Sequence, residues 1–344
     1  MTASQQPFLS LSFDEFQAWC IENKIPKFRA QQVFEWVYKK GCLDFSKMSN
    51  LAKDLQAKFA SSFSFPDFNI EEFVSDDGVR KFHVHLKDGK SVESVWIPEV
   101  SRATLCVSSQ VGCAMACKFC VTGLQGFMRN LTMEEILMQL YYVRWVRGLQ
   151  VSNVVFMGMG EPMLNYDNVV KAVNQMTDVK AYEMGHRKVS VSTVGMVPKI
   201  LKYFEDTNAR LAISLTGSSN ESRDHWMPIN QKHNLQELKK VLKQVPTNKW
   251  RKIMFEVVMI KDETDTDQQA KDLVNFLQGL AAKVNLIPYN ENPRFPDLKA
   301  PDREQLLKYR DRLMKAGFHT TIRKNRGNGI FGACGQLSST KYGN

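Results

Sequence analysis

The stretch GCAMACKFC places three cysteines, Cys113, Cys117 and Cys120, within eight residues. Thiolates spaced this closely in a chain typically bind a metal ion or an iron–sulfur cluster. A structural zinc site takes four protein ligands, usually from two paired knuckles, and the sequence has no second knuckle. His83 and His85, in KFHVHL, are the residues that could complete a zinc site. Three cysteines without a fourth favour instead a cluster with one iron open to an exogenous ligand.

The bulk composition limits the classes of protein that fit. The 344-residue chain has seven cysteines and no recognisable export signal, which favours reduced thiols over a disulfide framework. No stretch approaches about 18 uninterrupted apolar residues, so no membrane span is expected. We therefore expect a cytoplasmic protein. The formal net charge of +10 favours a polyanionic partner.

Six short β-branched runs from about residue 100 onward predict strands, and amphipathic patterns between them predict helices. The predicted strands are 103–109, 151–162, 187–195, 209–217, 252–260 and 282–290. The predicted helices are 132–148, 166–176, 197–207, 235–245, 266–280 and 302–317. Strands that alternate with single helices form βαβ units and a parallel sheet, in either an open doubly wound fold or a partial barrel.

Polar residues gather where the predicted strands end. Glu161, Ser192, Ser214 and Asn290 all lie at or just beyond the C-terminal end of a strand, and the cysteine cluster follows the first strand. In parallel barrels this rim is where active sites are built. Because most of the strands contribute to the same rim, we favour a partial barrel over an open sheet.

The region before the barrel has a different pattern. Short amphipathic, basic helical patterns come first, and an alternating apolar and polar stretch follows, with Asp77-Gly78 and Asp88-Gly89 at turn positions. The sequence thus predicts three parts: a helical accessory domain (1–62), a β-hairpin linker segment (63–99), and a barrel with a C-terminal cysteine loop (100–344).

The stretch VVFMGMGEP suits a bound ligand. Its glycines let a ligand approach the backbone, and Glu161 places a carboxylate where an ammonium group can bind. The pattern is not GxGxxG, and Pro162 disfavours an immediate helix, so a dinucleotide-binding fold is not indicated.

The Cys-x3-Cys-x2-Cys spacing, with Phe119 before the last cysteine, resembles the signature of radical S-adenosylmethionine (SAM) enzymes. Further segments, among them LCVSSQ, FMGMGEP, VSVSTVGMVP, HWMPIN, NLIPYN and GACGQL, are similar to the RlmN/Cfr family of radical SAM RNA methyltransferases. The resemblance extends over about residues 27–338. It implies an α/β fold with a partial (β/α)6 barrel behind a small N-terminal helical domain.

The resemblance also implies the cofactors and their ligands. A [4Fe–4S] cluster is expected on Cys113, Cys117 and Cys120. The implied SAM contacts are Gly160, Glu161, Ser192, Ser214, Leu215, Thr216 and Asn290. Thr216 departs from the family, which usually has histidine there, so its role depends on whether the contact is made by the side chain or the backbone.

Three further residues receive catalytic roles by resemblance. Cys334 is the implied methyl acceptor, Cys106 resolves a covalent RNA adduct by forming a disulfide, and Glu93 accepts a proton. A thiolate is needed because the electron-poor C2 carbon of adenine does not attack a sulfonium methyl group, whereas a thiolate does. From the residues alone, Cys106 is typical of a small buried hydrophobe and Glu93 of a solvent-facing strand position.

The implied function is formation of 2-methyladenine in the peptidyl transferase region of 23S ribosomal RNA and in tRNA next to the anticodon. The implied partners are these RNAs and an electron donor such as a flavodoxin or ferredoxin system. Arg323, Lys324 and Arg326, just before Cys334, are expected to contact RNA phosphates. The alternatives are Cfr-type methylation at C8 and a non-catalytic, zinc-containing RNA-binding protein, which would need neither Cys106 nor Cys334.

Overall fold

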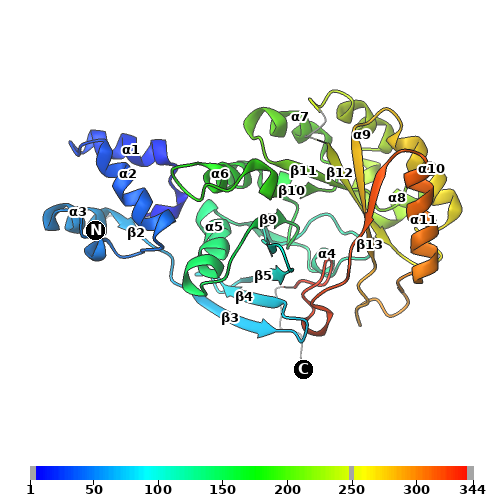
Figure 1. Cartoon of the computed structure of the whole chain (residues 1–344), viewed down its shortest axis with the longest axis horizontal. Helices are drawn as coiled ribbons and strands as arrows, with labels where there is room; N and C mark the ends of the chain where they lie inside the picture. Colours follow the sequence, from blue (N-terminus) through cyan, green and yellow to red (C-terminus); the bar gives the residue numbers. More distant parts are fainter. Residues whose placement is uncertain (1–4, 248–251, 339–344) are drawn as a thin grey trace.

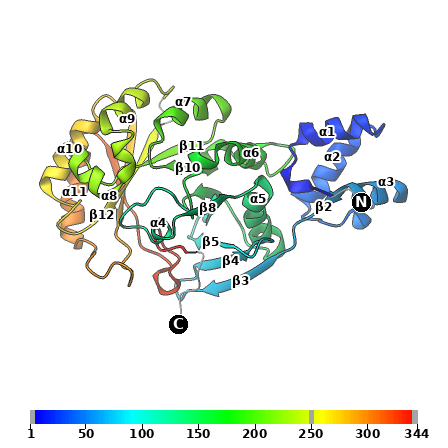
Figure 2. The ribbon, with the colours of Figure 1, turned by 180° about the vertical axis from the view of Figure 1, so that it is seen from behind.

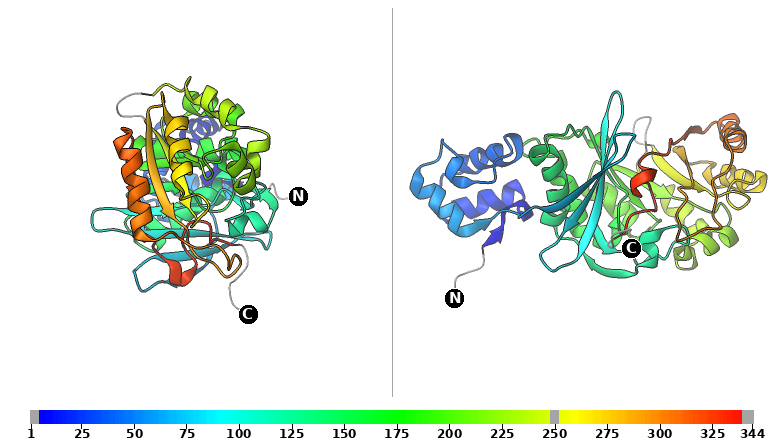
Figure 3. Two further views of the ribbon diagram at one scale, coloured as in Figure 1. Left: turned by 90° about the vertical axis from the view of Figure 1, so that its right-hand side faces the viewer. Right: turned by 90° about the horizontal axis from the view of Figure 1, so that it is seen from below.

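The computed structural model describes residues 5–247 and 252–338 of the chain. Figure 1 shows a helical region at one end of the molecule and a curved α/β body at the other. An antiparallel ribbon, formed by residues 69–98, lies against this body, and Figure 3 shows the helical region at one end of the long axis. No helix in the described residues is both long and apolar enough to cross a membrane.

Aromatic packing holds the N-terminal region together. Phe8, Phe16, Phe34 and Phe59 are buried, and the rings of Phe8 and Phe16 meet edge to face with 4.9 Å between their centroids. Such pairs add about 0.5–1.5 kcal/mol to the free energy of burial. The elements of this region are β1 (Gln6–Pro7), η1 (Phe8–Ser10), α1 (Phe13–Glu22), α2 (Phe28–Phe34), η2 (Glu35–Lys39), η3 (Phe45–Lys47), α3 (Lys53–Ser62) and β2 (Phe63–Ser64).

One ten-stranded sheet of the described residues organises the rest, in the order β14-β13-β12-β11-β10-β9-β6-β5-β4-β3. From β6 to β14 all neighbours in this sheet are parallel, whereas β3 to β6 pair antiparallel. The strands are β3 (Asn69–Val74), β4 (Arg80–His85), β5 (Ser91–Pro98), β6 (Ala103–Cys106), β9 (Asn153–Phe156), β10 (Val189–Thr193), β11 (Arg210–Ser214), β12 (Ile253–Met259), β13 (Ala282–Pro288) and β14 (His319–Ile322).

Helices lie on the outside of the curved parallel sheet (Figure 2). The helix predicted from residue 132 is present as α5, and Thr132 and Glu135 form a capping box at its start. The helical elements are α4 (Val121–Leu124), α5 (Met133–Tyr141), η4 (Tyr142–Val146), η5 (Pro162–Asn165), α6 (Tyr166–Thr177), η6 (His186–Lys188), α7 (Val197–Asp206), α8 (Asn220–Trp226), η7 (Pro228–Gln231), α9 (Leu235–Leu242), α10 (Asp267–Leu277), α11 (Arg303–Lys315) and η8 (Asn328–Ile330).

The predicted fold class, a partial (β/α)6 barrel with helical and hairpin additions, is confirmed. Each of the six predicted strands contains an observed parallel strand, and β14 extends the sheet beyond the prediction. The segment HTTI of β14 is short and half exposed, so it carries no apolar run that could have identified it.

The antiparallel ribbon is continuous with the barrel. Its turns contain Gly78 and Gly89, both with φ of +80°, as expected for hairpin glycines. Strand β5 pairs with β6 in a register that sets Val95 opposite Cys106. The boundary predicted between residues 99 and 100 therefore lies between two paired strands, and the ribbon forms part of the wall beside Cys106.

Candidate active site

A short hairpin holds the base of the cysteine loop. It consists of β7 (Gln110–Gly112) and β8 (Phe127–Asn130), and the Cys113 amide donates to Gly126 O over 2.9 Å. Gly112 has a φ of +72°, and a Cβ there would lie 1.9 Å from Gly126 O, so only glycine fits. These contacts fix the point at which the loop leaves the sheet.

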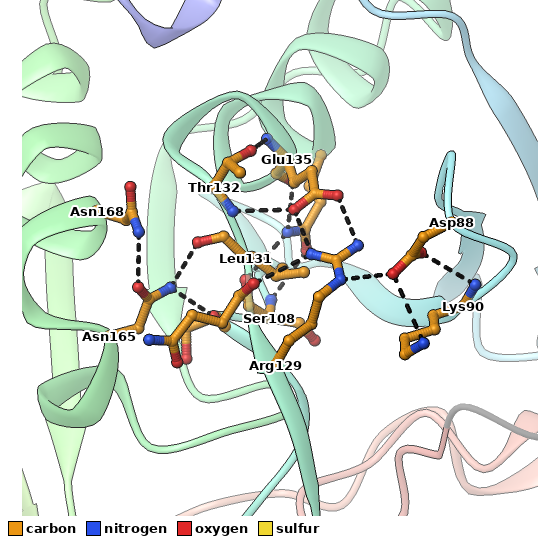
Figure 4. Close-up of polar contacts among 12 residues, drawn as sticks. Asp88, Lys90, Ser108, Arg129, Leu131, Thr132, Glu135, Asn165 and Asn168 are labelled. Atoms are coloured by element: carbon orange, nitrogen blue, oxygen red, sulfur yellow. Dashed lines mark hydrogen bonds and ion pairs between the residues drawn. The ribbon is translucent and has the colours of Figure 1, made fainter.

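Arg129 ties this hairpin to two other elements (Figure 4). Its guanidinium donates to both carboxylate oxygens of Glu135 at 2.8 Å and to Asp88 at 2.7 Å. The hydrogen bond from Arg129 lowers the pKa of Asp88 to about 2. Nearby, the Asn165 amide donates to Ser109 O over 2.8 Å. The cysteine loop thus begins from a base that is fixed on several sides.

Of the three clustered cysteines, Cys117 is buried, and Cys113 and Cys120 are half-buried. Burial raises the pKa of Cys113 to about 12, and it also raises the pKa values of Cys117 and Cys120. The other two thiols raise the pKa of Cys117 further, so the three sulfurs lie within electrostatic reach of one another. Trp226 and Met227 pack in the same hydrophobic cluster as Cys117. Over the described ranges, no three His, Cys, Asp or Glu side chains gather as a single metal ion requires.

A cavity of about 150 Å³, here called the inner cavity, adjoins the cysteine loop at the C-terminal ends of the strands. Six of the seven expected SAM contacts line it: Gly160, Glu161, Ser192, Ser214, Thr216 and Asn290. Cys120 and Cys334 also line it. The rim that the sequence predicts as the site is therefore the place where these residues meet.

Glu161 and Gly160 form one wall of the inner cavity. The Glu161 carboxylate accepts hydrogen bonds from the amides of Met163 at 3.0 Å and Val194 at 2.8 Å. Burial outweighs these bonds and raises the pKa of Glu161 to about 7. Gly160 has a φ of +100°, and a Cβ there would lie 2.5 Å from Gln110 Cβ. The glycine therefore cannot be replaced without displacing this wall.

Ser192 and Ser214 share a hydrogen bond of 3.3 Å between their hydroxyls, across the ends of β10 and β11. The buried Arg223 holds the same two strand ends, because it donates to Ser214 O at 3.1 Å and Val194 O at 2.6 Å. The sequence analysis did not identify Arg223. Its guanidinium keeps the two hydroxyls in register on the cavity wall.

Thr216 and Leu215 take different positions. The Thr216 hydroxyl lines the inner cavity and accepts from the Val258 amide over 3.3 Å. Leu215 is fully buried and is not part of the cavity lining, and its amide donates to Glu256 O over 2.8 Å. At Thr216 a small hydroxyl therefore stands where a larger imidazole is usual in the family.

The C-terminal strap, residues 333–338, closes the site from the side of α4. The Val121 amide donates to Gly335 O over 2.8 Å, and the Thr122 hydroxyl donates to Leu337 O over 2.7 Å. These bonds carry the last cysteine of the chain across the barrel opening and against the loop of the three clustered cysteines.

Cys334, on this strap, lies within electrostatic reach of Cys106. The Cys334 sulfur accepts a hydrogen bond from Arg323 Nη1 over 3.1 Å, and Cys334 raises the pKa of Arg323. Burial raises the pKa of Cys106 to about 12, and Cys334 adds to that rise. Asn290 Nδ2 donates to Cys334 O over 3.0 Å, while its buried Oδ1 has no partner among the described residues. The Arg323 guanidinium therefore interacts with both Cys334 and Cys106.

Glu93 is not exposed, so the interpretation from the residues alone is wrong. Only 2% of Glu93 is accessible, because the strap covers β5. Its carboxylate lies 2.9 Å from Lys81 Nζ and 3.6 Å from His83 Nδ1, and it accepts from the Ser338 amide over 3.0 Å. His85 Nε2 lies 2.9 Å from a carboxylate oxygen of β3. Both candidate zinc histidines are thus engaged with carboxylates.

A larger cavity of about 510 Å³, here called the outer cavity, occupies the barrel interior on the other side of Cys334. It is rich in basic side chains, which are Arg102, Arg187, Arg210, Lys252, Lys283, Arg323, Lys324 and Arg326. Its two acidic lining residues are Glu99 and Glu256. The net positive lining suits a polyanionic ligand.

The basic segment before the strap behaves differently from the sequence-based expectation. Arg323 contacts the Cys334 sulfur, and Arg326 is bound to the β3–β4 turn through Asp77 Oδ2 at 2.9 Å and Asp77 O at 2.6 Å. Lys324 is exposed and lines the outer cavity. Of the three predicted phosphate contacts, two therefore have partners within the protein and Lys324 keeps its side chain toward solvent.

Comparison with known families gives the class. The model of the radical SAM superfamily matches residues 107–276, and that of the ribosomal RNA large subunit methyltransferase N-terminal domain matches residues 7–64. The crystal structure of a radical SAM methyltransferase from Sphaerobacter thermophilus superimposes with a TM-score of 0.91 at 33% identity, covering 97% of this chain and 100% of that one. The fold and the three-cysteine loop thus define a radical SAM methyltransferase.

Curated relatives narrow the class. The dual-specificity RNA methyltransferase RlmN of Jannaschia sp. (strain CCS1) is 39% identical, covering 96% of this chain and 89% of that protein. The dual-specificity RNA methyltransferase RlmN 2 of Myxococcus xanthus (strain DK1622) is 41% identical, covering 91% and 85%. The chain belongs to the RlmN family of radical SAM RNA methyltransferases.

Proposed function

We propose that this chain methylates C2 of adenine, in the peptidyl transferase region of 23S ribosomal RNA and in tRNA next to the anticodon. The observation that carries the proposal is the position of Cys334, which lines both the inner and the outer cavity and lies within electrostatic reach of Cys106. One sulfur thus faces the expected SAM contacts on one side and a basic cavity on the other. The two substrate RNAs are proposed from the dual specificity in the relatives' names.

The residues around the cysteine loop fit a [4Fe–4S] cluster with SAM as the additional ligand. The donor set is three mutually close thiols in a hydrophobic surround, which suits a cluster with one open iron. The orphaned Oδ1 of Asn290 is a buried acceptor that needs a donor, and an α-ammonium or a ribose hydroxyl supplies one. When bound, the cluster supplies the electron that cleaves SAM, delivered from a flavodoxin or ferredoxin type of donor.

Cys334 receives the methyl group first in the proposed sequence. Its sulfur attacks the sulfonium methyl of one SAM, the carbon–sulfur bond of the donor breaks, and S-adenosylhomocysteine leaves. The Arg323 guanidinium, 3.1 Å from that sulfur, stabilises negative charge on it before the attack. Asn290 fixes the peptide of Cys334 from the inner-cavity side.

Cys106 and Glu93 act after the methyl carbon has been joined to the base. Cys106 attacks the sulfur of Cys334, and the bond from that sulfur to the carbon breaks with its electron pair passing to the carbon, which takes up a proton and becomes the methyl group. A disulfide between the two cysteines remains, and it must be reduced before the next turnover. Glu93 takes the proton from C2 in this proposal. Because the carboxylate now holds the Ser338 amide and Lys81, accepting a proton requires the strap to shift.

The test is analysis of the product nucleoside. Reduced holoenzyme is incubated with SAM and either a 23S ribosomal RNA fragment or a tRNA transcript, and the RNA is digested and analysed by mass spectrometry. We expect 2-methyladenosine from both RNAs. 8-Methyladenosine would indicate a Cfr-type activity instead, and zinc in place of iron and sulfide with no methylated product would support the binding protein.

The raised pKa of Glu161 predicts a pH-dependent affinity for SAM. Below about pH 7 the buried carboxyl of the ligand-free protein is protonated and does not pair with the SAM ammonium. Affinity should therefore rise with pH, by up to about tenfold per unit below pH 7, and level off above it. Titration calorimetry from pH 5.5 to 8.5 measures this. Glu161→Gln should bind SAM more weakly, and its affinity should not vary with pH. If this variant kept the pH dependence of the wild type, the assignment would be contradicted.

Lys324 is expected to contribute one phosphate contact. Lys324→Ala should weaken RNA binding and lower the slope of log affinity against log salt by about one unit. The matched control is Lys308→Ala, since Lys308 is paired with Glu304 on α11 and does not line the outer cavity. Fluorescence anisotropy of a labelled tRNA transcript, at salt concentrations from about 50 to about 200 mM, measures the affinity and the salt slope of both variants. Equal slopes for the two variants would mean that Lys324 is merely solvated.

A further inference from the structure

The two cavities meet at five shared lining residues: Met157, Glu256, Ile287, Asn290 and Cys334. Under the proposed function, on which this inference rests, the target base must reach the sulfur of Cys334 from the outer cavity. The base must therefore enter this junction. Of the five residues, Glu256 carries an ionisable group to which neither the sequence analysis nor the proposed mechanism gives a role.

Glu256 is held so that one oxygen is engaged and the other is not. It lies on β12, is 7% exposed, and its Oε2 accepts from Asn285 Nδ2 over 2.8 Å. Asn285 Oδ1 in turn accepts from the Thr321 hydroxyl over 2.9 Å, which fixes the amide with its NH2 group toward Glu256. No hydrogen bond between described residues reaches Glu256 Oε1.

Because Glu256 lines both cavities and its Oε1 accepts no hydrogen bond from a described residue, that oxygen is free to accept one from a ligand in the junction. Burial also raises the pKa of Glu256, which indicates how dry the surroundings are. The other shared walls are apolar, since Met157 and Ile287 can cover the faces of a planar ring. The junction thus offers two apolar surfaces and one unsatisfied acceptor at its edge.

We infer that Glu256 Oε1 accepts a hydrogen bond from the exocyclic amine of the target adenine and thereby selects that base. Adenine presents an amine donor where guanine presents a carbonyl acceptor. A guanine in the same pose would set its carbonyl oxygen against a buried carboxylate, which is a repulsive contact. Asn285 and Thr321 act as positioning residues, because they orient the carboxylate without touching the base.

A purely structural role for Glu256 is the competing explanation. Arg323 lowers the pKa of Glu256, so the carboxylate also balances the charge of the guanidinium beside Cys334. That role predicts an equal loss with every substrate when Glu256 is changed. Recognition of the amine predicts a loss that depends on whether the amine is present.

The experiment is a cycle of two RNA hairpins and four enzymes. One hairpin carries adenosine at the target position and the other carries purine riboside, which lacks the amine. The enzymes are the wild-type holoenzyme, Glu256→Leu, Glu256→Gln and, as control, Glu304→Gln, an acid on α11 that is paired with Lys308 and lines neither cavity. Initial methylation rates give kcat/KM, and fluorescence anisotropy gives the affinity of each hairpin.

With wild type, the purine hairpin should have a kcat/KM about ten- to a hundredfold below that of the adenosine hairpin. Glu256→Leu should lower the adenosine value by a similar factor and leave the purine value nearly unchanged. Glu256→Gln keeps an acceptor oxygen and should recover most of the preference, and Glu304→Gln should match wild type. The cycle cancels any intrinsic difference in reactivity between the two bases.

Two readouts guard against misfolding: iron content, and methylation of Cys334 by SAM without RNA, which should persist in every variant. An equal loss with both hairpins in well-folded Glu256→Leu, or full preference retained there, would overturn the inference. If wild type modified neither hairpin at C2, the proposed function would fail as well, and the two failures are thereby distinguished.

Discussion

Alanine in place of Cys117 is expected to abolish the iron–sulfur chromophore and reduce RNA methylation to background. Cys117 is buried among Trp226 and Met227 in the middle of the three thiols, so no other described cysteine can take its place without moving the loop. Absorption spectra and iron and sulfide analysis after anaerobic preparation measure the cluster. Formation of 5′-deoxyadenosine from SAM measures its activity.

The matched control for this substitution is Cys42→Ala, which removes a half-buried thiol in the helical region. It should keep both iron and activity. The cluster assignment would be wrong if folded Cys117→Ala protein retained either the chromophore or the production of 5′-deoxyadenosine.

The two lone cysteines are expected to fail at different steps. Cys334→Ala removes the methyl acceptor, so the protein should carry no methyl group and the RNA none either. Cys106→Ala should still accept a methyl group on Cys334 but should stall with RNA attached, because the thiol that releases the adduct is gone. Denaturing gels with labelled RNA, followed by mass spectrometry of the Cys334 peptide, distinguish these outcomes.

Arg323 interacts with both Cys334 and Cys106. A variant of this residue therefore distinguishes slower methyl transfer from misfolding in the same assay. Arg323→Lys keeps a cation near the Cys334 sulfur and should slow methylation of Cys334 without blocking it.

Free methylated RNA made at the wild-type rate by Cys106→Ala would show that Cys106 has no part in release of the RNA from the protein.

Much of the fold could be predicted from the sequence because its signals are local. The βα alternation, the Thr132–Glu135 capping box and the two glycine turns of the ribbon depend on residues a few positions apart. The location of the site at one rim could also be predicted, because parallel strands share one C-terminal edge. This rule predicts Glu161, Ser192 and Asn290 at one rim, and all three line the inner cavity there.

The features that the sequence analysis did not predict mostly involve contacts between residues far apart in the chain. Glu93 alternates like a surface position, but Lys81 and His83 of β4 and the strap, 245 positions later at Ser338, enclose its carboxylate. Arg326 meets Asp77 across 249 positions, so its charge was taken for a phosphate contact. Glu256 sits in an apolar strand pattern, where an isolated acid has no local signal of function.

The strap also determines how the reactive sulfur can travel. It is held by separate hydrogen bonds to α4, to Glu93 and, through Gln336, to Glu291 O at 2.9 Å, each of a kind that contributes about 1 kcal/mol net. A residue inside a strand would need the sheet to open before it could move. Here a few bonds can break one at a time while the barrel stays folded. The proposed methyl carrier is thus on a short tether, which would let one sulfur meet the methyl donor, the base and Cys106 in turn.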